Sequence, residues 1–481
     1  MRARTPTRSP GWVLALTGLG SLMVALDTLV VSTALSTIRV DLGASIQELE
    51  WTVNAYSLSF AVLLMTASAL GDRYGRRRLF STGLAVFALS SAACALAPSA
   101  GLLIAARAVQ GAGAALVLPL GLALLTAAFP PEKRGLAIGL FSAITGLAVA
   151  SGPLVGGAVV QGIDWTWIFW INVPIGLLAV PFVLRKIEES FGGDTGVDVR
   201  GLLLVTGAAL GVVWGLVRGN PAGWDSAEVV GSLAAGVLLT VAFVLWELRA
   251  REPMLPLRLF RNRGFTAGNA ATFFQVASLF GAVFFFAQLL QTGMGYGPLD
   301  AGLRLMPWTG TFFCVAPIAG ALANRVGERQ LMVTGLLIQA AGMTWVALIA
   351  GPGLSYSHLV IPLVVAGVGV SMAIPAAQNS VVGTLPPETV GKAAGTNSMM
   401  RELGGVFGVA VLVAVFAGAG SYASPQAFTD GFGPAIGVAA GLSAIGALIA
   451  TALPGRSRSD TAERVRGERG AGAVSAVRET A

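Results

Sequence analysis

Four charged residues lie within long apolar stretches of the sequence, where a charge is costly. Asp27 lies in the stretch 11–37, Arg107 in 101–128, and Arg401 and Glu402 in 393–420. A charge inside a membrane span costs roughly 2.5–3.5 kcal/mol on the insertion scale, so such residues are candidates for function. A carboxyl group removed from water takes up a proton more readily, whereas arginine stays charged. We therefore expect Asp27 to carry a proton and Arg107 to be its electrostatic partner.

A static buried ion pair that fixes helix packing is the alternative for Asp27 and Arg107. Arg401 and Glu402 are adjacent, and neighbouring helical residues point about 100° apart, so both cannot face one partner. We group these two with four amide side chains as candidate contacts of a substrate cavity, namely Asn269, Gln288, Gln291 and Asn397. The helices expected to line that cavity begin near residues 11, 101, 136, 265 and 393.

The composition indicates an all-α membrane protein. Of the 481 residues, 55% are hydrophobic and 11% are charged, against roughly 25% charged in soluble domains. The pattern G-x-x-x-x-G-K-[ST] and zinc-ligand spacings do not occur, so we expect no ATP site, no metal site and no catalytic residues. The net charge of +7 is spread over short loops, which argues against a nucleic-acid partner.

Apolar segments of about 20 residues are long enough to cross a bilayer. We predict fourteen transmembrane helices, at residues 11–37, 51–70, 79–98, 101–128, 136–161, 167–186, 199–217, 227–247, 265–291, 301–323, 330–350, 358–385, 393–420 and 433–453.

An internal repeat divides these helices into two parallel six-helix bundles with two inserted helices. Residues 68–77 return at 320–329, the segment 110–119 returns at 366–375, and Phe129–Glu132 returns at Leu385–Glu388. The copies are eight spans apart, so both halves cross the membrane in the same direction, as in many transporters. The predicted divisions are an N-terminal stretch (1–10), a first bundle (11–186), inserted helices with linkers (187–264), a second bundle (265–453) and a disordered tail (454–481).

The positions of the basic residues set the orientation, because cytoplasmic loops are enriched in lysine and arginine. With both termini in the cytoplasm, all but five of the 31 basic residues fall on the inner side; the exceptions are Arg39, Arg107, Arg218, Arg304 and Arg401. We expect a multi-pass protein of the plasma membrane, and the composition is typical of bacteria.

Two further sets of residues suggest moving parts. Small residues in the fifth span allow close helix approach, and we expect a bent interface that parts during transport, ordinary packing being the alternative; they are Gly139, Gly152, Pro153, Gly156 and Gly157. The loop after the second span is either a solvated charged loop or a latch that forms in one conformation; its residues are Asp72, Arg73, Gly75, Arg76 and Arg77. The second copy has Asn324 and Glu328 in place of Asp72 and Arg76, so a latch there should be weaker.

These motifs resemble the major facilitator superfamily, and within it the fourteen-span drug:proton antiporters. Residues 68–80 are similar to the superfamily's loop motif G-x-L-a-D-r-x-G-r-k-x-x-l, with Ser68 replacing the first glycine. Residues 104–113 resemble l-x-x-R-x-x-q-G-x-g, whose arginine, here Arg107, is implicated in proton coupling. Residues 139–157 resemble the antiporter motif, with Ala148 replacing a glycine.

Two further segments are similar to this group. Residues 26–35 resemble L-D-x-T-V-V-N-V-A-L, with departures at Leu29 and Ser32, and residues 165–174 resemble W-R-W-x-F-x-I-N-x-P, with Thr166 replacing arginine. The resemblance implies the major facilitator fold and export of amphipathic small molecules by alternating access. The proton gradient would drive export without a bound cofactor or ATP, in a protein that acts as a monomer in the lipid bilayer. The alternatives are a dedicated exporter of a host-made metabolite or lipid, and a transport-inactive membrane sensor or scaffold.

Overall fold

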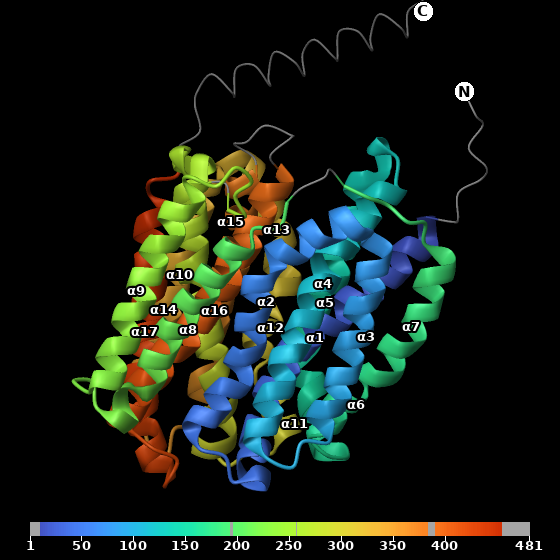
Figure 1. The fold of residues 1–481 in the computed structure, drawn as a ribbon. Helices are drawn as coiled ribbons and strands as arrows, with labels where there is room; N and C mark the ends of the chain where they lie inside the picture. Colours follow the sequence, from blue (N-terminus) through green and yellow to red (C-terminus); the bar gives the residue numbers. More distant parts are fainter. Residues whose placement is uncertain (1–9, 193–195, 256, 383–389, 455–481) are drawn as a thin grey trace, which may run out of the picture.

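The computed structural model describes residues 10–192, 196–255, 257–382 and 390–454, and these residues are mostly helical (Figure 1). The expected N-terminal stretch and C-terminal tail lie almost entirely outside the described residues. The first part of the chain forms α1 (Pro10–Leu42), α2 (Ile46–Tyr74), α3 (Arg76–Ala95), α4 (Ala100–Ala128), α5 (Pro131–Gly162), α6 (Trp167–Trp170) and α7 (Asn172–Lys186).

Two helices, α8 (Val199–Ala222) and α9 (Ala227–Glu247), follow and pack against each other. The rest of the chain forms η1 (Leu257–Arg261), α10 (Arg263–Gln288), η2 (Leu289–Gly293), α11 (Pro298–Arg304), α12 (Met306–Thr309), α13 (Thr311–Val326), α14 (Glu328–Ile349), α15 (Tyr356–Val382), α16 (Val390–Ala419) and α17 (Pro425–Ala450).

Local sequence signals define several helix ends. Ser45 and Glu48 form a capping box at the start of α2, in which each side chain bonds to the backbone of the other residue. The Asn262 side chain accepts bonds from two backbone N–H groups at the start of α10. Gly75 and Gly327 occupy equivalent turns of the repeat, and both have a positive φ, of 110° and 94°. Glycine adopts this conformation without steric cost.

The long helices run side by side through one bundle (Figure 1). Twelve of the described helical segments are long and apolar enough to cross a membrane. Two of the expected spans are not among these twelve. The span expected at 136–161 corresponds to α5, some of whose side chains lie outside the described residues. The span expected at 301–323 is divided into α11, α12 and α13.

The bundle has two ends, which the chain direction distinguishes. Pro10 at the start of α1 and Ala450 at the end of α17 lie at the same end, here called the termini end, at the top of Figure 1. The loop between α2 and α3 lies there as well. The other end, called the opposite end, carries the connection between α1 and α2 and the turn between α8 and α9.

The sequence repeat is also a repeat of helix contacts. A Cβ atom added at Gly111 would lie 2.2 Å from the carbonyl oxygen of Tyr56, and one added at Gly367 would lie 2.4 Å from that of Trp308. These distances do not occur between real side chains and backbone, so glycine permits the close approach. Tyr56 and Trp308 are themselves 252 residues apart, which is the distance between residues 68–77 and their second copy at 320–329.

Candidate functional site: a buried ion pair and a central cavity

Asp27 of α1 and Arg107 of α4 form an ion pair that is closed off from solvent. The Arg107 Nη1 atom lies 2.5 Å from the Asp27 Oδ2 atom, and each side chain is 1% exposed. The guanidinium also lies 4.1 Å from the centre of the Tyr56 ring, and its Nε donates to the Thr52 carbonyl at 3.2 Å. The structure thus joins the two residues that the sequence predicts as partners.

Neutral hydrogen-bonding groups complete the surroundings of the Asp27 carboxylate. Its Oδ1 atom accepts from Gln110 Nε2 at 3.0 Å and from Asn172 Nδ2 at 3.2 Å. Both amides also donate to the Ser91 hydroxyl, each at 3.2 Å. Hydrogen bonds to a charged group are stronger than those between neutral groups. Five side chains from α1, α3, α4 and α7 therefore hold one negative and one positive charge in a dry interior.

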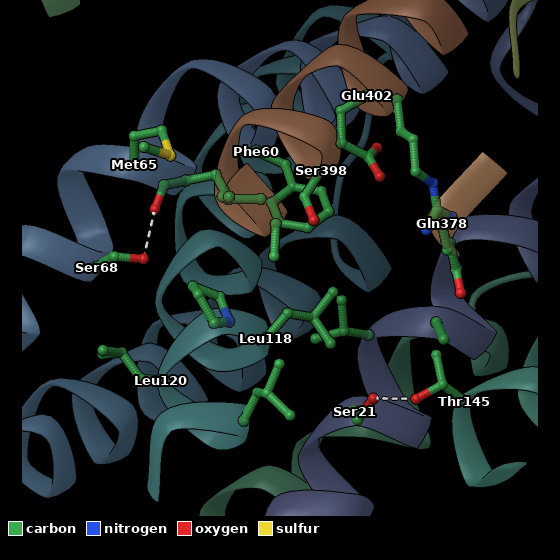
Figure 2. Close-up of a pocket in the computed structure, with 18 of the residues that line it drawn as sticks. Ser21, Phe60, Met65, Ser68, Leu118, Leu120, Thr145, Gln378, Ser398 and Glu402 are labelled. Atoms are coloured by element: carbon green, nitrogen blue, oxygen red, sulfur yellow. Dashed lines mark hydrogen bonds between the residues drawn. The ribbon is translucent and has the colours of Figure 1, made fainter. Parts of the chain in front are cut away.

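A cavity of about 1090 Å³ lies in the centre of the bundle (Figure 2). The five helices expected to line it all do so (α1, α4, α5, α10 and α16), together with α2, α12, α13 and α15. Its wall is mainly apolar, with several hydroxyl groups; the Ser21 and Thr145 hydroxyls are 2.6 Å apart. This size and lining suit a drug-sized amphipathic molecule.

The charged residues of the cavity wall lie in two places. Asp72, Arg76, Arg251 and Glu252 belong to segments at the termini end, where the helices of both halves begin or end. Arg401 and Glu402 lie deeper, about 17 Å along α16 from its start at 1.5 Å per residue. The cavity therefore extends from the termini end toward the middle of the bundle.

Asp27 points away from this cavity. Val24, Ala25 and Thr28 of α1 line the cavity, whereas the Asp27 side chain faces α4 and α7. Successive helical residues are turned by about 100°, so one helix presents its substrate-side residues and its carboxylate in different directions. The ion pair and the cavity are thus adjacent but separate in this conformation.

The four amide side chains expected in the cavity make other contacts. Asn397 Nδ2 donates to Asn269 Oδ1 at 3.2 Å between α16 and α10. The Gln288 amide oxygen accepts from the Tyr422 hydroxyl, and Gln291 Nε2 donates to the Thr33 carbonyl at 2.9 Å. None of the four is among the described residues that line the cavity. Their role as substrate contacts stays a prediction, whereas Arg401 and Glu402 do line the wall.

The glycine motif of α5 lies where the two halves meet at the opposite end. A Cβ atom at Gly157 would lie 2.3 Å from the carbonyl oxygen of Pro298 in α11, and one at Gly302 would lie 2.4 Å from that of Pro153. Gly152 and Gly156 pack instead against α1, at Leu29 and Val30, and Gly139 has open space beside it. The motif therefore joins α5 both to its own half and to α11.

Polar contacts add to this closure of the opposite end. The Leu299 N–H donates to Gln161 Oε1 at 3.0 Å, and the Arg39 guanidinium lies 4.4 Å from the centre of the Tyr422 ring. Burial raises the pKa of the Tyr422 hydroxyl, so this group stays protonated and donates to Gln288. Contacts between the first and second halves thus close the opposite end of the bundle, which is the end without the cavity mouth.

The loop between α2 and α3 is bonded to the segment after α7. Asp72 pairs with Arg76 at 2.7 Å, and the Asp72 carbonyl accepts from the Gly192 N–H at 3.0 Å. The Glu189 carboxylate accepts from the Arg77 N–H at 2.8 Å. Gly75 allows the turn, and Arg73 lies 5.5 Å from the centre of the Tyr74 ring. The equivalent Asn324 side chain lies outside the described residues.

The sequence matches a known family over nearly its whole length. The model of the Major Facilitator Superfamily matches residues 17–409 and 288–478. The chain belongs to the Major Facilitator Superfamily. It is therefore a transporter and not an enzyme, and its membrane-spanning helices make it a multi-pass protein of the plasma membrane.

Several relatives in this superfamily are named for antibiotics. The chain is 35% identical to the tetracenomycin C resistance and export protein of Streptomyces glaucescens, over 90% of this chain and 82% of that protein. It is 35% identical to a cephamycin export protein of Amycolatopsis lactamdurans over 95% of both chains. It is 36% identical to a methylenomycin A resistance protein of Streptomyces coelicolor, over 82% of this chain and 83% of that one.

Solved structures of other transporters share the fold. A peptide transporter crystallised with sulfate superimposes with a TM-score of 0.67 at 15% identity, covering 91% of this chain and 93% of that one. The xylose transporter of E. coli in a partially occluded inward open conformation gives a TM-score of 0.61 at 13% identity, over 91% and 96%.

Sequence reasoning missed several residues of the site. Gln110 and Asn172 belong to segments that resemble the family motifs, but they carry no charge and were not assigned to the site, although Gln110 follows Arg107 by three residues and therefore shares its helix face. Glu189 lies in a loop between spans. Glu50 was missed because the second span was expected to begin at residue 51, whereas α2 begins at Ile46. Its carboxyl group is fully buried.

Proposed function

We propose that this superfamily member is a proton-coupled exporter of amphipathic small molecules that works by alternating access. Asp27 is the proton carrier and Arg107 its electrostatic partner. The energy comes from the proton gradient, without ATP or a bound cofactor, and a monomer suffices for transport. The observation that carries the proposal is the fully buried pair of Asp27 and Arg107. Asp27 lies on α1, whose residues next to it line a drug-sized cavity.

The chemistry of the pair suits proton coupling. When Asp27 is ionised, its negative charge balances the positive charge of Arg107. A proton on Asp27 would leave the Arg107 charge buried without a counter-charge, which costs several kcal/mol. Because Asp27 and Arg107 come from different helices, that cost can be relieved by a change in how α1 and α4 pack. Protonation and helix arrangement are thereby linked.

The cavity indicates the class of substrate. Phe60, Phe280 and Trp308 contribute aromatic surface, while Gln378 and Glu402 contribute polar groups. Figure 2 shows Phe60, Gln378 and Glu402 around the space. A flat, partly polar molecule of antibiotic size would bury its apolar surface here. The relatives named for export of tetracenomycin C and cephamycin support this class.

We further propose fourteen transmembrane helices with both termini in the cytoplasm, as in the fourteen-span drug:proton antiporters. Twelve candidate spans, α5 and the divided segment α11–α13 together supply fourteen crossings. The basic residues Arg76, Arg77 and Arg78 lie at the termini end, as the enrichment of positive charge on the cytoplasmic side requires. In this orientation the cavity is open to the cytoplasm and the opposite end is the sealed outer side.

A second candidate function is the dedicated export of one metabolite. The relatives named for a single antibiotic favour it. Both functions use the same ion pair and cavity, and they differ in substrate range. A panel of antibiotics and dyes tested for resistance in a host without its own pumps separates them, since a dedicated exporter would protect against one chemical group.

Proton coupling is tested in inverted membrane vesicles that hold an imposed proton gradient. Addition of a transported compound should release protons from wild-type vesicles, and Asp27→Asn should abolish the response. A wild-type protein that protects against no compound and moves no protons would contradict the proposal and favour a sensor or scaffold. The Asp225→Asn variant serves as the control, because Asp225 is exposed in the turn between α8 and α9.

A further inference from the structure

Glu50 of α2 is a buried carboxyl group without a counter-charge. Its residue exposure is 0%, and no basic side chain among the described residues lies within ion-pair distance. The Asn54 Nδ2 atom donates to Oε1 at 3.3 Å, and Oε2 has no hydrogen-bond partner among the described residues. This differs from Asp27, whose carboxylate has one cation and two amide donors.

The charged side chains on the helices that pack against α2 contact partners other than Glu50 or line the cavity. α4, α16, α3, α8 and α1 surround α2. Arg107 pairs with Asp27, Arg218 with Glu228, and Arg76 with Asp72. Others are placed as follows: Asp41 accepts from Trp165, Arg39 lies over Tyr422, Arg200 lies over Trp246, and Arg401 and Glu402 line the cavity.

Glu50 lies on α2 of the first half, a helix that packs against α16 of the second half. Near the cavity, a Cβ atom at Gly395 of α16 would lie 2.6 Å from Met65 of α2. Glu50 is fifteen residues before Met65, or about 22 Å toward the opposite end at 1.5 Å per residue. The antiparallel α16 reaches that level near Val409–Val413, and Leu49 shares an apolar cluster with these two valines. At the depth of Glu50, the two halves therefore meet in an apolar contact.

We propose that Glu50 is a second proton-binding site, at the outer closure, and that its protonation holds the outer side shut. An unpaired carboxylate in this apolar contact would cost several kcal/mol, whereas the neutral acid costs far less. The O–H group of the neutral acid also supplies a donor beside Asn54, whose Oδ1 atom has no partner among the described residues. The closed form therefore holds a proton on Glu50.

Opening the outer side would separate α2 from α16 and expose Glu50 to water, where it ionises. The closed form binds one more proton than the open form, so acid favours closure and alkali favours opening. For a single proton, this changes the ratio of the two forms by up to about tenfold per pH unit. The inference rests on the alternating access and orientation of the proposed function. It does not rest on proton transport by Asp27.

Two measurements on the purified full-length protein test the proposal. The first is the spin-label distance between Leu96→Cys and His358→Cys, in a chain without Cys94 and Cys314. Both positions are exposed and lie at the opposite end, one in each half. In the wild type, the fraction of molecules with the long label distance should increase as the pH rises. The pH-dependent part should be lost in Glu50→Gln, which should stay closed, and retained in Asp27→Asn.

The second measurement is the infrared carbonyl band of a neutral carboxylic acid. The closed form should show this band, and Glu50→Gln should lack it. Glu48→Gln is the matched control, because Glu48 is two residues away and is bonded to Ser45 at the exposed start of α2. If Glu50→Gln does not fold, Glu50→Asp should keep the band at a shifted frequency.

The proposal would be overturned if the label distance in Glu50→Gln depended on pH as it does in the wild type. It would also be overturned if this variant kept the infrared carbonyl band unchanged. These failures differ from failure of the proposed function. A protein whose label distance never changes contradicts alternating access, yet the infrared band still reports the protonation of Glu50. Conversely, normal export by the Asp27→Asn variant would refute the assignment of Asp27 as the proton carrier, and it would leave the result for Glu50 unaffected.

Discussion

At the scale of single residues, the question is what the Asp27–Arg107 pair contributes. A buried ion pair often stabilises a protein little, because desolvation offsets the attraction, but removal of one partner costs about 3–5 kcal/mol. Here Gln110 and Asn172 also bond the carboxylate. These neutral donors can hold Asp27 in place when its charge changes, which a simple structural pair does not need.

The first prediction is that Asp27→Asn abolishes uphill export to the level of vesicles without the protein. Asparagine keeps the shape and the polar contacts but cannot exchange a proton. Binding of substrate should survive, since Asp27 does not line the cavity. The measurement is gradient-driven efflux from proteoliposomes together with substrate binding by the purified protein. Normal uphill export by this variant would refute the assignment.

The sequence predicts charged partners better than neutral ones. Asp27 and Arg107 could be paired in advance because charges inside spans are rare. Gln288, Gln291, Asn269 and Asn397 were expected in the cavity, but buried amides serve equally well between helices, as the Asn397–Asn269 bond shows. A polar side chain in a span indicates burial, whereas the side of the helix that it faces depends on packing between distant segments.

At the scale of helices, α5 is one of the elements that join the two halves at the opposite end. Its residues Gly157 and Pro153 contact the backbone of α11. Small residues allow such close backbone contact in membranes. The antiporter motif, expected as either a seal or ordinary packing, thus lies at a contact between halves in this conformation. Gly152, which packs on Leu29, belongs to the interior of the first half.

The second prediction is that Gly157→Ala weakens the closure of the opposite end. The added methyl group would overlap the Pro298 carbonyl, and overpacking of this kind costs about 1–3 kcal/mol. The ratio of closed to open forms should fall by a factor of about 5 to 160. The measurement is labelling of Leu96→Cys and His358→Cys pairs for distance, combined with proton leak in vesicles.

A control for this prediction lies in the same motif. Gly139→Ala adds a methyl group to open space on the same helix, and alanine is the better helix former by about 0.5–1 kcal/mol. It should leave closure and proton leak unchanged. Equal effects of the two substitutions would show that steric contact with α11 is not what closes this end.

The third prediction is that Asp72→Ala changes the balance of inward- and outward-facing forms more than Asn324→Ala. Asp72 forms a half-buried ion pair with Arg76 and lines the cavity mouth. Loss of a charged hydrogen bond of about 1.5–3 kcal/mol shifts an equilibrium by about tenfold to a hundredfold. Cysteine accessibility from each side, measured with the efflux rate, checks this. If both variants behave alike, the loop sets topology without acting as a latch.

Helix positions follow from apolar runs, but helix breaks do not. The expected span at 301–323 is divided near Leu305 and Gly310. Pro307 lacks the N–H group that an unbroken helix would use, which explains an irregularity here without fixing its form. The resulting short helix α11 is the element that α5 packs against, so the break creates the closure that the sequence left unspecified.

At the scale of the whole molecule, the duplicated sequence predicts the duplicated contacts. Gly113 approaches Phe87 and Gly83 on α3, and Gly369 approaches Gln339 and Gly335 on α14 in the same way. The halves diverge in chemistry, because the second half has Leu363 at the position of Arg107 and Ala366 at that of Gln110. One half therefore holds the ion pair and the other contributes mainly apolar and aromatic surface.

The inserted helices α8 and α9 give the last prediction, which concerns the number of crossings. They pack on each other, and α8 also contacts α2 and α16, one helix from each half. If both cross the membrane, Asp225 in their connecting turn and Arg251 after α9 must lie on opposite sides. In a chain without Cys94 and Cys314, an impermeant maleimide should label Asp225→Cys in intact cells and Arg251→Cys after permeabilisation. Labelling of both positions from the same side would mean that α9, the helix between them, does not span the membrane.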